Sequence, residues 1–382
     1  MPLKVAARGH LPPFIVMDVM SAATEREAAT GDCLHLEVGQ PGTPAPRGVI
    51  EAAHAALARE RLGYTVALGI PRLRERIAAH YREAYGATVP PERVVATAGS
   101  SGAFVLAFLA AFDPGDRVAL AAPGYPCYRN ILRACGIEPV ELPAGPETRY
   151  QPTPALLDAL DPPPDGLIVA SPANPTGSML APADLAALTH HCERAGIRLV
   201  SDEIYHGITY GMPAETALSF GDAAIVVNSF SKYYSMTGWR LGWMVVPEDM
   251  IRAVECLAQN LYISPPTLSQ HAAVAAFDCR EELDANVARY AANRRLLLDR
   301  LPAAGFDRLA PADGAFYIYA EIGRLTNDSP AFCRRMLAET GVAATPGVDF
   351  DPARGHATLR FSFAGPTEDM AEAADRVRRW LG

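Results

Sequence analysis

Lysine is almost missing from this sequence of 382 residues, in which lysine and arginine together number 34. Lys4 and Lys232 are the only two lysines, and arginine supplies every other fixed positive charge. An arginine side chain stays charged in proteins, whereas a desolvated lysine amine can lose its proton and attack a carbonyl carbon. Lys232 lies inside the stretch NSFSKYYSMTGWR at 228–240 and is therefore a candidate for forming a Schiff base. On the scarcity of lysine alone, a Schiff-base role for Lys232 and an ordinary position on the surface are equally well supported.

An excess of basic charge is also missing, since the formal net charge is -9 and the sequence pI is ≈ 5.5. A chain without a basic stripe does not neutralise phosphate backbones, so we expect no nucleic-acid partner. No stretch reaches the ~18 uninterrupted apolar residues that a membrane span needs, and the first residues lack the apolar core of a secretory signal. We therefore expect no membrane association and a cytoplasmic location.

Metal and nucleotide motifs are missing as well. The seven cysteines are odd in number, scattered, and never arranged as CxxC. Such spacing predicts reduced thiols rather than a disulfide framework, and it predicts no metal site. Neither GxGxxG nor GxxxxGK[ST] occurs, which argues against a nicotinamide dehydrogenase and against a P-loop enzyme.

An alternation of short apolar runs with helix-like segments begins at Val94. The runs are VVAT, RVALAA, EPVEL, GLIVA, IRLVSD, AAIVVNS and GWMVV. Continuously apolar strands are buried on both faces, so the pattern predicts an α/β fold with a mostly parallel central sheet flanked by helices. Ligands collect at the carboxyl ends of such strands. Polar or glycine-rich loops follow five of the runs, namely TAGSSGAF, PGYPCY, SPANPTG, DEIYHGI and FSKYYS.

Three segments are predicted along the chain: an N-terminal arm at 1–44, a large α/β domain at 45–284 and a smaller α+β domain at 285–382. The arm, rich in proline and glycine, is expected to pack with the small domain. Further helices are predicted at 16–29, 48–62, 249–260, 265–278, 281–301, 330–340 and 367–381, and strands at 315–320 and 357–363.

Two of the loops carry groups suited to a small phosphate or a ring. In TAGSSGAF, glycines permit a tight turn, and Ser100 and Ser101 add hydroxyls to the amides of a helix N-terminus, which suits a phosphate. Gly-Ser turns are common, so this loop is weak evidence alone. In SPANPTG, two prolines hold Asn174 on a rigid loop, and Asn174–Pro175 is a candidate cis bond.

The strand before DEIYHG delivers Asp202 and, three residues on, Tyr205. An acid at the end of a strand often only caps a helix. Beside a Schiff-base lysine, however, a carboxylate can keep a pyridine nitrogen protonated and make the ring an electron sink. Ser229, Ser231 and Arg240 surround the lysine with three groups able to bind phosphate, so the combination describes a pocket for pyridoxal phosphate.

Arg360 lies in the otherwise apolar run LRFSFAG. Arginine binds carboxylates through two parallel hydrogen bonds, so this residue is a candidate for an anionic substrate group. An arginine that faces solvent from an edge strand has equal weight on this evidence.

The ensemble resembles the aspartate-aminotransferase-like enzymes, the fold-type-I, pyridoxal-phosphate-dependent class I and II aminotransferases. The resemblance covers nearly the whole chain, and its most specific parts are SPANPTG, SDEIY and SFSKYYSMTGWRLGW in the family's order and spacing. It implies an enzyme that moves the amino group of an L-amino acid to a 2-oxo acid by a ping-pong Schiff-base mechanism.

The resemblance also implies roles for individual residues. Lys232 would hold the cofactor and move the proton, Asp202 would pair with the ring nitrogen, and Tyr205 and Asn174 would bind the phenolic oxygen. The phosphate would be bound by Ser100, Ser101, Ser229, Ser231 and Arg240.

Four more positions match the family's pattern. Tyr125 in PGYP would stack on the ring, and Gly39 and Arg360 would bind the substrate carboxylate, together with Asn174. Tyr64 in GYTVALG would reach the phosphate held by a neighbouring subunit. A homodimer with shared active sites is implied.

Two features of the sequence bear on which substrate side chain is preferred. Acid-specific members of the closest subgroup carry a lysine where this chain has Ser101, which argues against a preference for aspartate without excluding it. FIVMDVM at 14–20 and Tyr262 could form an apolar lid, although core packing is their more common role. A neutral or aromatic donor with 2-oxoglutarate or pyruvate is favoured; a β-lyase and a non-catalytic, cofactor-binding regulator are the alternatives.

Overall fold

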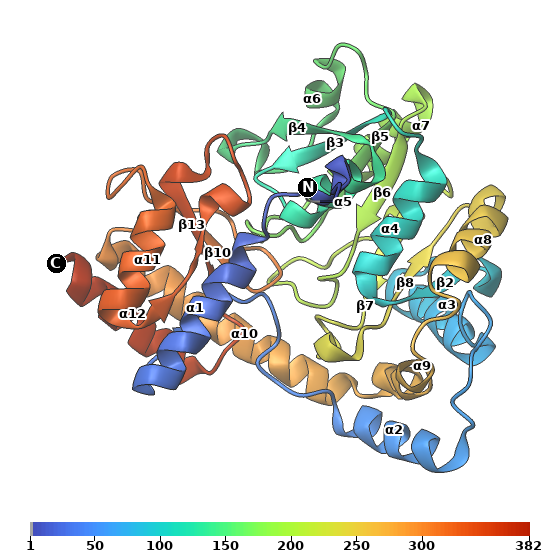
Figure 1. The fold of residues 1–382 in the computed structure, drawn as a ribbon, viewed down its shortest axis with the longest axis horizontal. Helices are drawn as coiled ribbons and strands as arrows, with labels where there is room; N and C mark the ends of the chain where they lie inside the picture. Colours follow the sequence, from blue (N-terminus) through green and yellow to red (C-terminus); the bar gives the residue numbers. More distant parts are fainter. Residues whose placement is uncertain (1–2) are drawn as a thin grey trace.

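The computed structural model describes residues 3–382, and in this part of the chain a seven-stranded sheet is the largest (Figure 1). Its strand order is β2-β8-β7-β6-β5-β3-β4. Neighbouring strands are parallel except that β8 runs antiparallel to β2 and to β7. The strands are β2 (Val94–Thr97), β3 (Arg117–Ala122), β4 (Glu138–Pro143), β5 (Gly166–Ala170), β6 (Arg198–Asp202), β7 (Ile225–Ser229) and β8 (Gly242–Val245). Each coincides with an apolar run of the sequence, so the predicted α/β fold is confirmed.

Helices cover the faces of this sheet, and the strands inside it, such as β5 and β7, are therefore buried along most of their length. Proline occupies the first turn of several of them, where its missing N–H costs no hydrogen bond. Glycine in the left-handed conformation ends the same helices at Gly86, Gly136 and Gly196. The helices are α2 (Arg47–Arg59), α3 (Pro71–Tyr85), α4 (Gly99–Ala111), α5 (Pro126–Cys135), α6 (Pro154–Asp158), α7 (Pro182–Ala195), α8 (Ile251–Leu261) and α9 (Thr267–Ala273).

A second, antiparallel sheet has the order β12-β13-β10-β9. Its strands are β9 (Arg308–Leu309), β10 (Tyr317–Glu321), β12 (Thr345–Pro346) and β13 (Thr358–Ser362). Around it lie α10 (Arg280–Arg300), α11 (Ser329–Thr340) and α12 (Thr367–Leu381) (Figure 1). The helices predicted at 281–301, 330–340 and 367–381 are confirmed.

The N-terminal segment lies against this second region. Helix α1 (Ile15–Thr30) contacts β11 and β12, and β1 (Leu34–His35) pairs in parallel with β11 (Val342–Ala343). The predicted helix at 16–29 is thus confirmed. A short β run was expected from His35 onwards, in HLEV, and β1 overlaps it at His35, whereas the two-residue β11 was not predicted because it is too short to show a hydrophobic period. Residues 1–2 of the predicted arm lie outside the described part of the chain.

The predicted boundary after residue 284 falls inside α10, which runs from beside α9 towards the antiparallel sheet (Figure 1). No helix within residues 3–382 is long and apolar enough to cross a membrane.

Candidate active site

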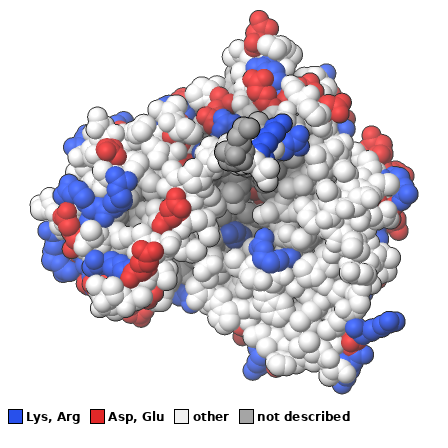
Figure 2. Space-filling model, in the orientation of Figure 1, with Lys and Arg blue, Asp and Glu red and all other residues white. Residues whose placement is uncertain are grey.

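A cavity of ≈ 460 Å³ opens at the carboxyl ends of the central strands. Ala170 ends β5, Asp202 ends β6, and Lys232 follows β7, and all three line the cavity. Figure 2 shows the hollow between the two regions of the molecule, with basic side chains inside it. The parallel sheet thereby brings together loops that are far apart in the sequence, as the rule for such sheets predicts.

Lys232 is half-buried, and its Nζ donates a hydrogen bond to the Gly39 carbonyl oxygen at 2.6 Å. Burial, helped by the charge of Arg360, lowers the pKa of this amine to about 8. A substantial fraction of the amine is therefore neutral slightly above neutral pH, which is the form that attacks a carbonyl carbon.

Asp202 is a buried carboxylate whose pKa is raised to about 6, chiefly by desolvation. Two donors oppose that shift: the Tyr128 hydroxyl bonds to Oδ2, and the Ile204 N–H donates to Oδ1 at 3.0 Å. These bonds hold the carboxylate at the floor of the cavity and favour its ionised form at neutral pH.

Tyr205 and Asn174 line the cavity together with Tyr317. The hydroxyls of Tyr205 and Tyr317 share a hydrogen bond of 2.6 Å, and the Asn174–Pro175 peptide is cis, as predicted. Both Tyr205 and Asn174 can therefore present a polar group to one ligand.

Arg360 lies on β13, between β12 and β10, and is only 2% exposed. Its Nη1 donates to Asn174 Oδ1 at 2.9 Å, and the guanidinium lies 4.4 Å from the centre of the Tyr317 ring and 4.8 Å from that of Phe350. Among residues 3–382 no carboxylate forms an ion pair with it, and its Nε has no partner. A buried cation in this condition favours an anionic ligand, and the alternative of a solvent-facing arginine is wrong.

A second anion site is formed at the N-terminus of α4. Ser100 and Ser101 lie in its first turn and line the cavity, and the helix has no side-chain cap. Arg240 lies so close that a Cβ on Gly99 would come within 2.5 Å of its Nη2. Uncapped amides, hydroxyls and a guanidinium at one place make this a candidate cradle for a phosphate.

Gly39 and Tyr125 also line the cavity. A Cβ at Gly39 would lie 2.1 Å from the Tyr317 hydroxyl, so the close approach of that tyrosine requires glycine here. The Tyr125 ring meets Tyr128 and Phe14 edge to face at 5.2 and 5.8 Å between ring centres.

Three predicted residues do not line the cavity. Ser229 sits behind the wall, where its hydroxyl bonds to that of the cavity residue Ser231 at 2.8 Å. Tyr64 is 83% exposed and does not line the cavity. Tyr262, suggested as part of a lid, is 37% exposed and also lies outside the lining.

Sequence reasoning missed Tyr128, Thr237 and Tyr317, which line the cavity beside the predicted residues. Tyr128 lies on α5, about one helical turn after the N-cap Tyr125, and this spacing could have indicated that both tyrosines face the same cavity. Tyr317 comes from the second region of the chain, and no local pattern connects it with Lys232.

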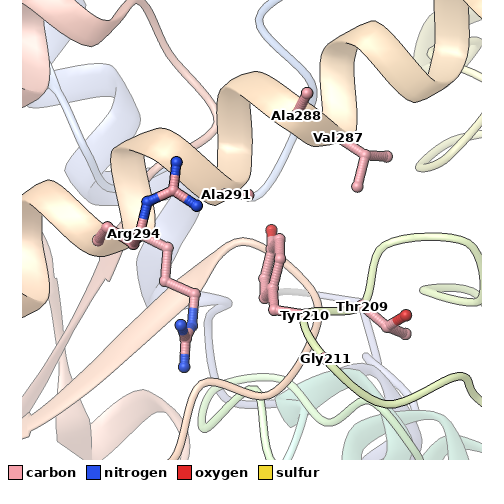
Figure 3. Close-up of a pocket in the computed structure, with 8 residues that line it drawn as sticks. Thr209, Tyr210, Gly211, Val287, Ala288, Ala291 and Arg294 are labelled. Carbon is pink, nitrogen blue, oxygen red and sulfur yellow. The ribbon is translucent and has the colours of Figure 1, made fainter.

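A second hollow of ≈ 400 Å³ lies between α10 and the loop at 209–211 (Figure 3). Tyr210 and Arg294 border it, but Arg294 Nε already donates to the Ala312 carbonyl oxygen at 2.6 Å. Its lining contains no carboxylate, thiol or imidazole. Within residues 3–382, no group of three histidine, cysteine or acidic residues is placed to hold a metal ion.

The family described as "Aminotransferase class I and II" matches residues 31–377. A valine–pyruvate aminotransferase of Mycobacterium tuberculosis is 56% identical over 99% of this chain and 98% of its own length. A crystal structure of an aminotransferase from Mycobacterium tuberculosis has a TM-score of 0.98 at 56% identity, covering 100% of this chain and 99% of the other. The structure of aspartate aminotransferase from Thermus thermophilus with maleate has a TM-score of 0.93 at 32% identity, covering 99% and 100%.

Proposed function

The chain belongs to the class I and II aminotransferases, the fold-type-I enzymes that use pyridoxal phosphate, and from this premise we propose that it transfers the amino group of a neutral L-amino acid to a 2-oxo acid. An aliphatic donor and a monocarboxylic acceptor such as pyruvate fit best. The supporting observation is the apolar wall that Phe14, Val16, Met17 and Met20 contribute to the cavity.

The cavity fits the cofactor in three respects. A Cβ at Gly99 would displace the Arg240 guanidinium from the phosphate cradle, the amine of Lys232 has a lowered pKa, and the carboxylate of Asp202 is buried at the floor. When bound, pyridoxal phosphate supplies an aldehyde that captures amines and a ring that accepts electrons from a bond broken at Cα.

We propose that Lys232 holds the cofactor covalently and that its Nζ, once released, removes the proton from the substrate Cα and returns it. Asp202 keeps the ring nitrogen protonated, and Tyr205 and Asn174 donate to the phenolic oxygen. Arg240, Ser100, Ser101 and Ser231 bind the phosphate, with Ser229 orienting Ser231 through the 2.8 Å bond.

Arg360 is proposed to bind the substrate α-carboxylate. Its buried guanidinium has a free Nε and forms no ion pair with an acidic side chain within residues 3–382, so a substrate carboxylate would supply the missing contact partner of opposite charge. Because donor and acceptor use one site in turn, the same arginine serves both.

The substrate side chain is proposed to meet the first turns of α1. Phe14, Val16, Met17 and Met20 line the cavity there, and the lining cations are Lys232, Arg240 and Arg360. Each of these cations has a proposed task, which leaves none for a second carboxylate. Placing a carboxylate against an apolar wall costs several kcal/mol, so aspartate and glutamate should react poorly. The 56% identical relative is named for valine and pyruvate.

A half-reaction screen tests this. The purified holoenzyme is mixed with L-valine, L-alanine, L-phenylalanine, L-aspartate or L-glutamate, and loss of the visible absorption of the bound cofactor is followed. Valine or alanine should react at least about tenfold faster than aspartate. Faster reaction with aspartate would contradict the proposal, and release of ammonia without an acceptor would indicate a β-lyase instead.

A homodimer is proposed on the basis of an exposed apolar face made by Tyr64, Val66, Tyr262 and Ile263, called here the Tyr64 face. The Thr65 N–H donates to Ser264 Oγ at 3.4 Å, which joins its two segments. A second copy would cover this face and place Tyr64 at the phosphate of its neighbour.

Subunit complementation tests the shared site. Mixtures of inactive Lys232→Ala and impaired Tyr64→Ala protein should regain activity, because each hybrid dimer contains one site with both native residues. Activity that stays at the average of the parents would refute the sharing of Tyr64.

The division into an arm at 1–44 and domains at 45–284 and 285–382 is proposed as well, supported by a hydrophobic cluster centred on the second sheet. Limited proteolysis can locate the junctions. A cytoplasmic location, supported by the scattered cysteines, is testable by cell fractionation.

A further inference from the structure

The first turns of α1 form one wall of the cavity through Val16, Met17 and Met20, with Phe14 at the N-cap. The helix itself buries little apolar surface. Only Val16 and Ala23 of its residues are buried, and Met17 is 49% exposed. A helix with so little buried apolar surface depends on other contacts for its position.

Phe14 cannot cap the helix with its side chain. The cap comes instead from Asp349, more than 300 residues away: its Oδ1 accepts the Ile15 N–H at 3.2 Å, and its Oδ2 accepts the Val16 N–H at 3.2 Å. A carboxylate at this end also matches the positive end of the helix dipole.

Asp349 is 2% exposed and is itself fixed to a different wall of the cavity. Arg129 of α5 donates to the Asp349 carbonyl oxygen, and the Gly124 N–H donates to the Phe350 carbonyl oxygen at 3.0 Å. Gly124 immediately precedes Tyr125, which lines the cavity. One short segment thus joins the α1 wall to the Tyr125 wall.

We propose that Asp349 is a positioning residue for substrate selection: its carboxylate holds the first turn of α1 so that the apolar wall packs against the substrate side chain. This rests on the proposed function, because it assumes that the side chain meets that wall. Asp349 does not line the cavity, so it acts through α1.

Asp349→Asn removes the charge and one of the two acceptors with little change in size. We expect KM for L-valine to rise about fivefold, the scale expected for loss of one buried hydrogen bond, with kcat changed less than about twofold. KM for L-alanine should change less, because its methyl group does not reach as far. Any influence of the Asp349 charge on Arg360 affects both donors alike and cancels in the ratio of their kcat/KM values.

Asp328→Asn is the matched control. Asp328 caps α11 through the Ala331 N–H at 3.0 Å and does not line the cavity. This variant should leave the valine-to-alanine ratio unchanged, because Asn is about as good an N-cap as Asp and α11 does not border the cavity. Hydrogen exchange supplies a readout independent of activity, since the Ile15 and Val16 amides should exchange faster only in Asp349→Asn.

A fall in the valine-to-alanine ratio together with faster exchange at α1 supports the proposal. An unchanged ratio overturns it, and so does a changed ratio with unchanged exchange. If the wild-type protein converts neither donor, the proposed function is wrong, and so is the proposed selection by Asp349. Hydrogen exchange of the Ile15 and Val16 amides then still decides whether Asp349 anchors α1.

Discussion

Replacing Tyr128 with phenylalanine would test how Asp202 is kept ionised. The change removes the hydroxyl that donates to Asp202 Oδ2. It leaves the ring in place against Phe104 and Tyr125, whose ring centres lie at 5.1 and 5.2 Å. The Ile204 N–H remains as the other donor to the carboxylate. The substitution therefore changes one hydrogen bond and little of the packing.

The size of the effect follows from the strength of that bond. A hydrogen bond to a charged group contributes ~1.5–3 kcal/mol, which corresponds to a change in pKa of ~1–2 units. Burial already raises the pKa of Asp202 to about 6, and the Tyr128 hydroxyl is the largest influence that opposes it. Without that hydroxyl, the pKa should rise to roughly 7–8.

The direction of the pH effect depends on which protonation state of Asp202 is active. Asp202 is proposed to act as a carboxylate, so activity is present above its pKa and is lost as the pH falls through it. At about pH 7 the ionised fraction would fall from ~0.9 to between ~0.5 and ~0.1, which lowers kcat/KM about two- to ninefold. The loss should largely disappear at about pH 9.

The assay is kcat/KM of the holoenzyme over this pH range, compared with wild type. A bound, positively charged ring would move the acid limbs of both proteins to lower pH together, so the quantity to compare is the separation of ~1–2 pH units between the two limbs. Tyr81→Phe is a matched control, because Tyr81 is a buried tyrosine that accepts a bond from Trp243 Nε1 at 3.1 Å and does not line the cavity. An acid limb that does not move in Tyr128→Phe would refute the reasoning.

Three further substitutions probe the amine, the cation and the cradle. Lys232→Ala should abolish turnover and the borohydride-fixable attachment of cofactor, and labelled cofactor on another residue would contradict its role. Arg360→Ala should lower kcat/KM about 10²- to 10³-fold for amino acid and 2-oxo acid alike, chiefly through KM, since a buried charged pair is lost; unchanged kinetics would mean that the carboxylate binds elsewhere. Gly99→Ala should weaken cofactor binding measured by fluorescence titration, because its Cβ would lie 2.5 Å from Arg240 Nη2. Gly86→Ala has the same backbone strain, with φ of +70° against +71°, but meets nothing within 4 Å, so it should lose stability without losing affinity; equal affinity of the two variants would argue against the cradle.

Several parts of the site could be predicted because they depend on local sequence. Five of the seven apolar runs that form central strands are followed by a polar or glycine-rich loop, and parallel strands place their carboxyl ends at one edge. Asn174, Asp202 and Lys232 could therefore be expected to meet without knowledge of the strand order.

Other parts could not be predicted because they depend on contacts between distant segments. Nothing near Asp349 indicates that it caps a helix at Ile15, and nothing near Tyr317 indicates that it shares a hydrogen bond with Tyr205. Whether Arg360 is buried or faces solvent could not be predicted for the same reason, since its strand β13 becomes internal only by pairing with β12 on one side and β10 on the other.

The sequence by itself determined which chemistry is available: one interior lysine in an arginine-rich chain, acid and amide groups after apolar strands, and a glycine-serine turn. These are properties of residue types and short spacings, which need no folding to be read. The tertiary structure decided which groups are desolvated and which face one another. Burial lowers the pKa of Lys232 and leaves Arg360 without an acidic partner in the described chain, and such effects arise only when distant segments exclude water together.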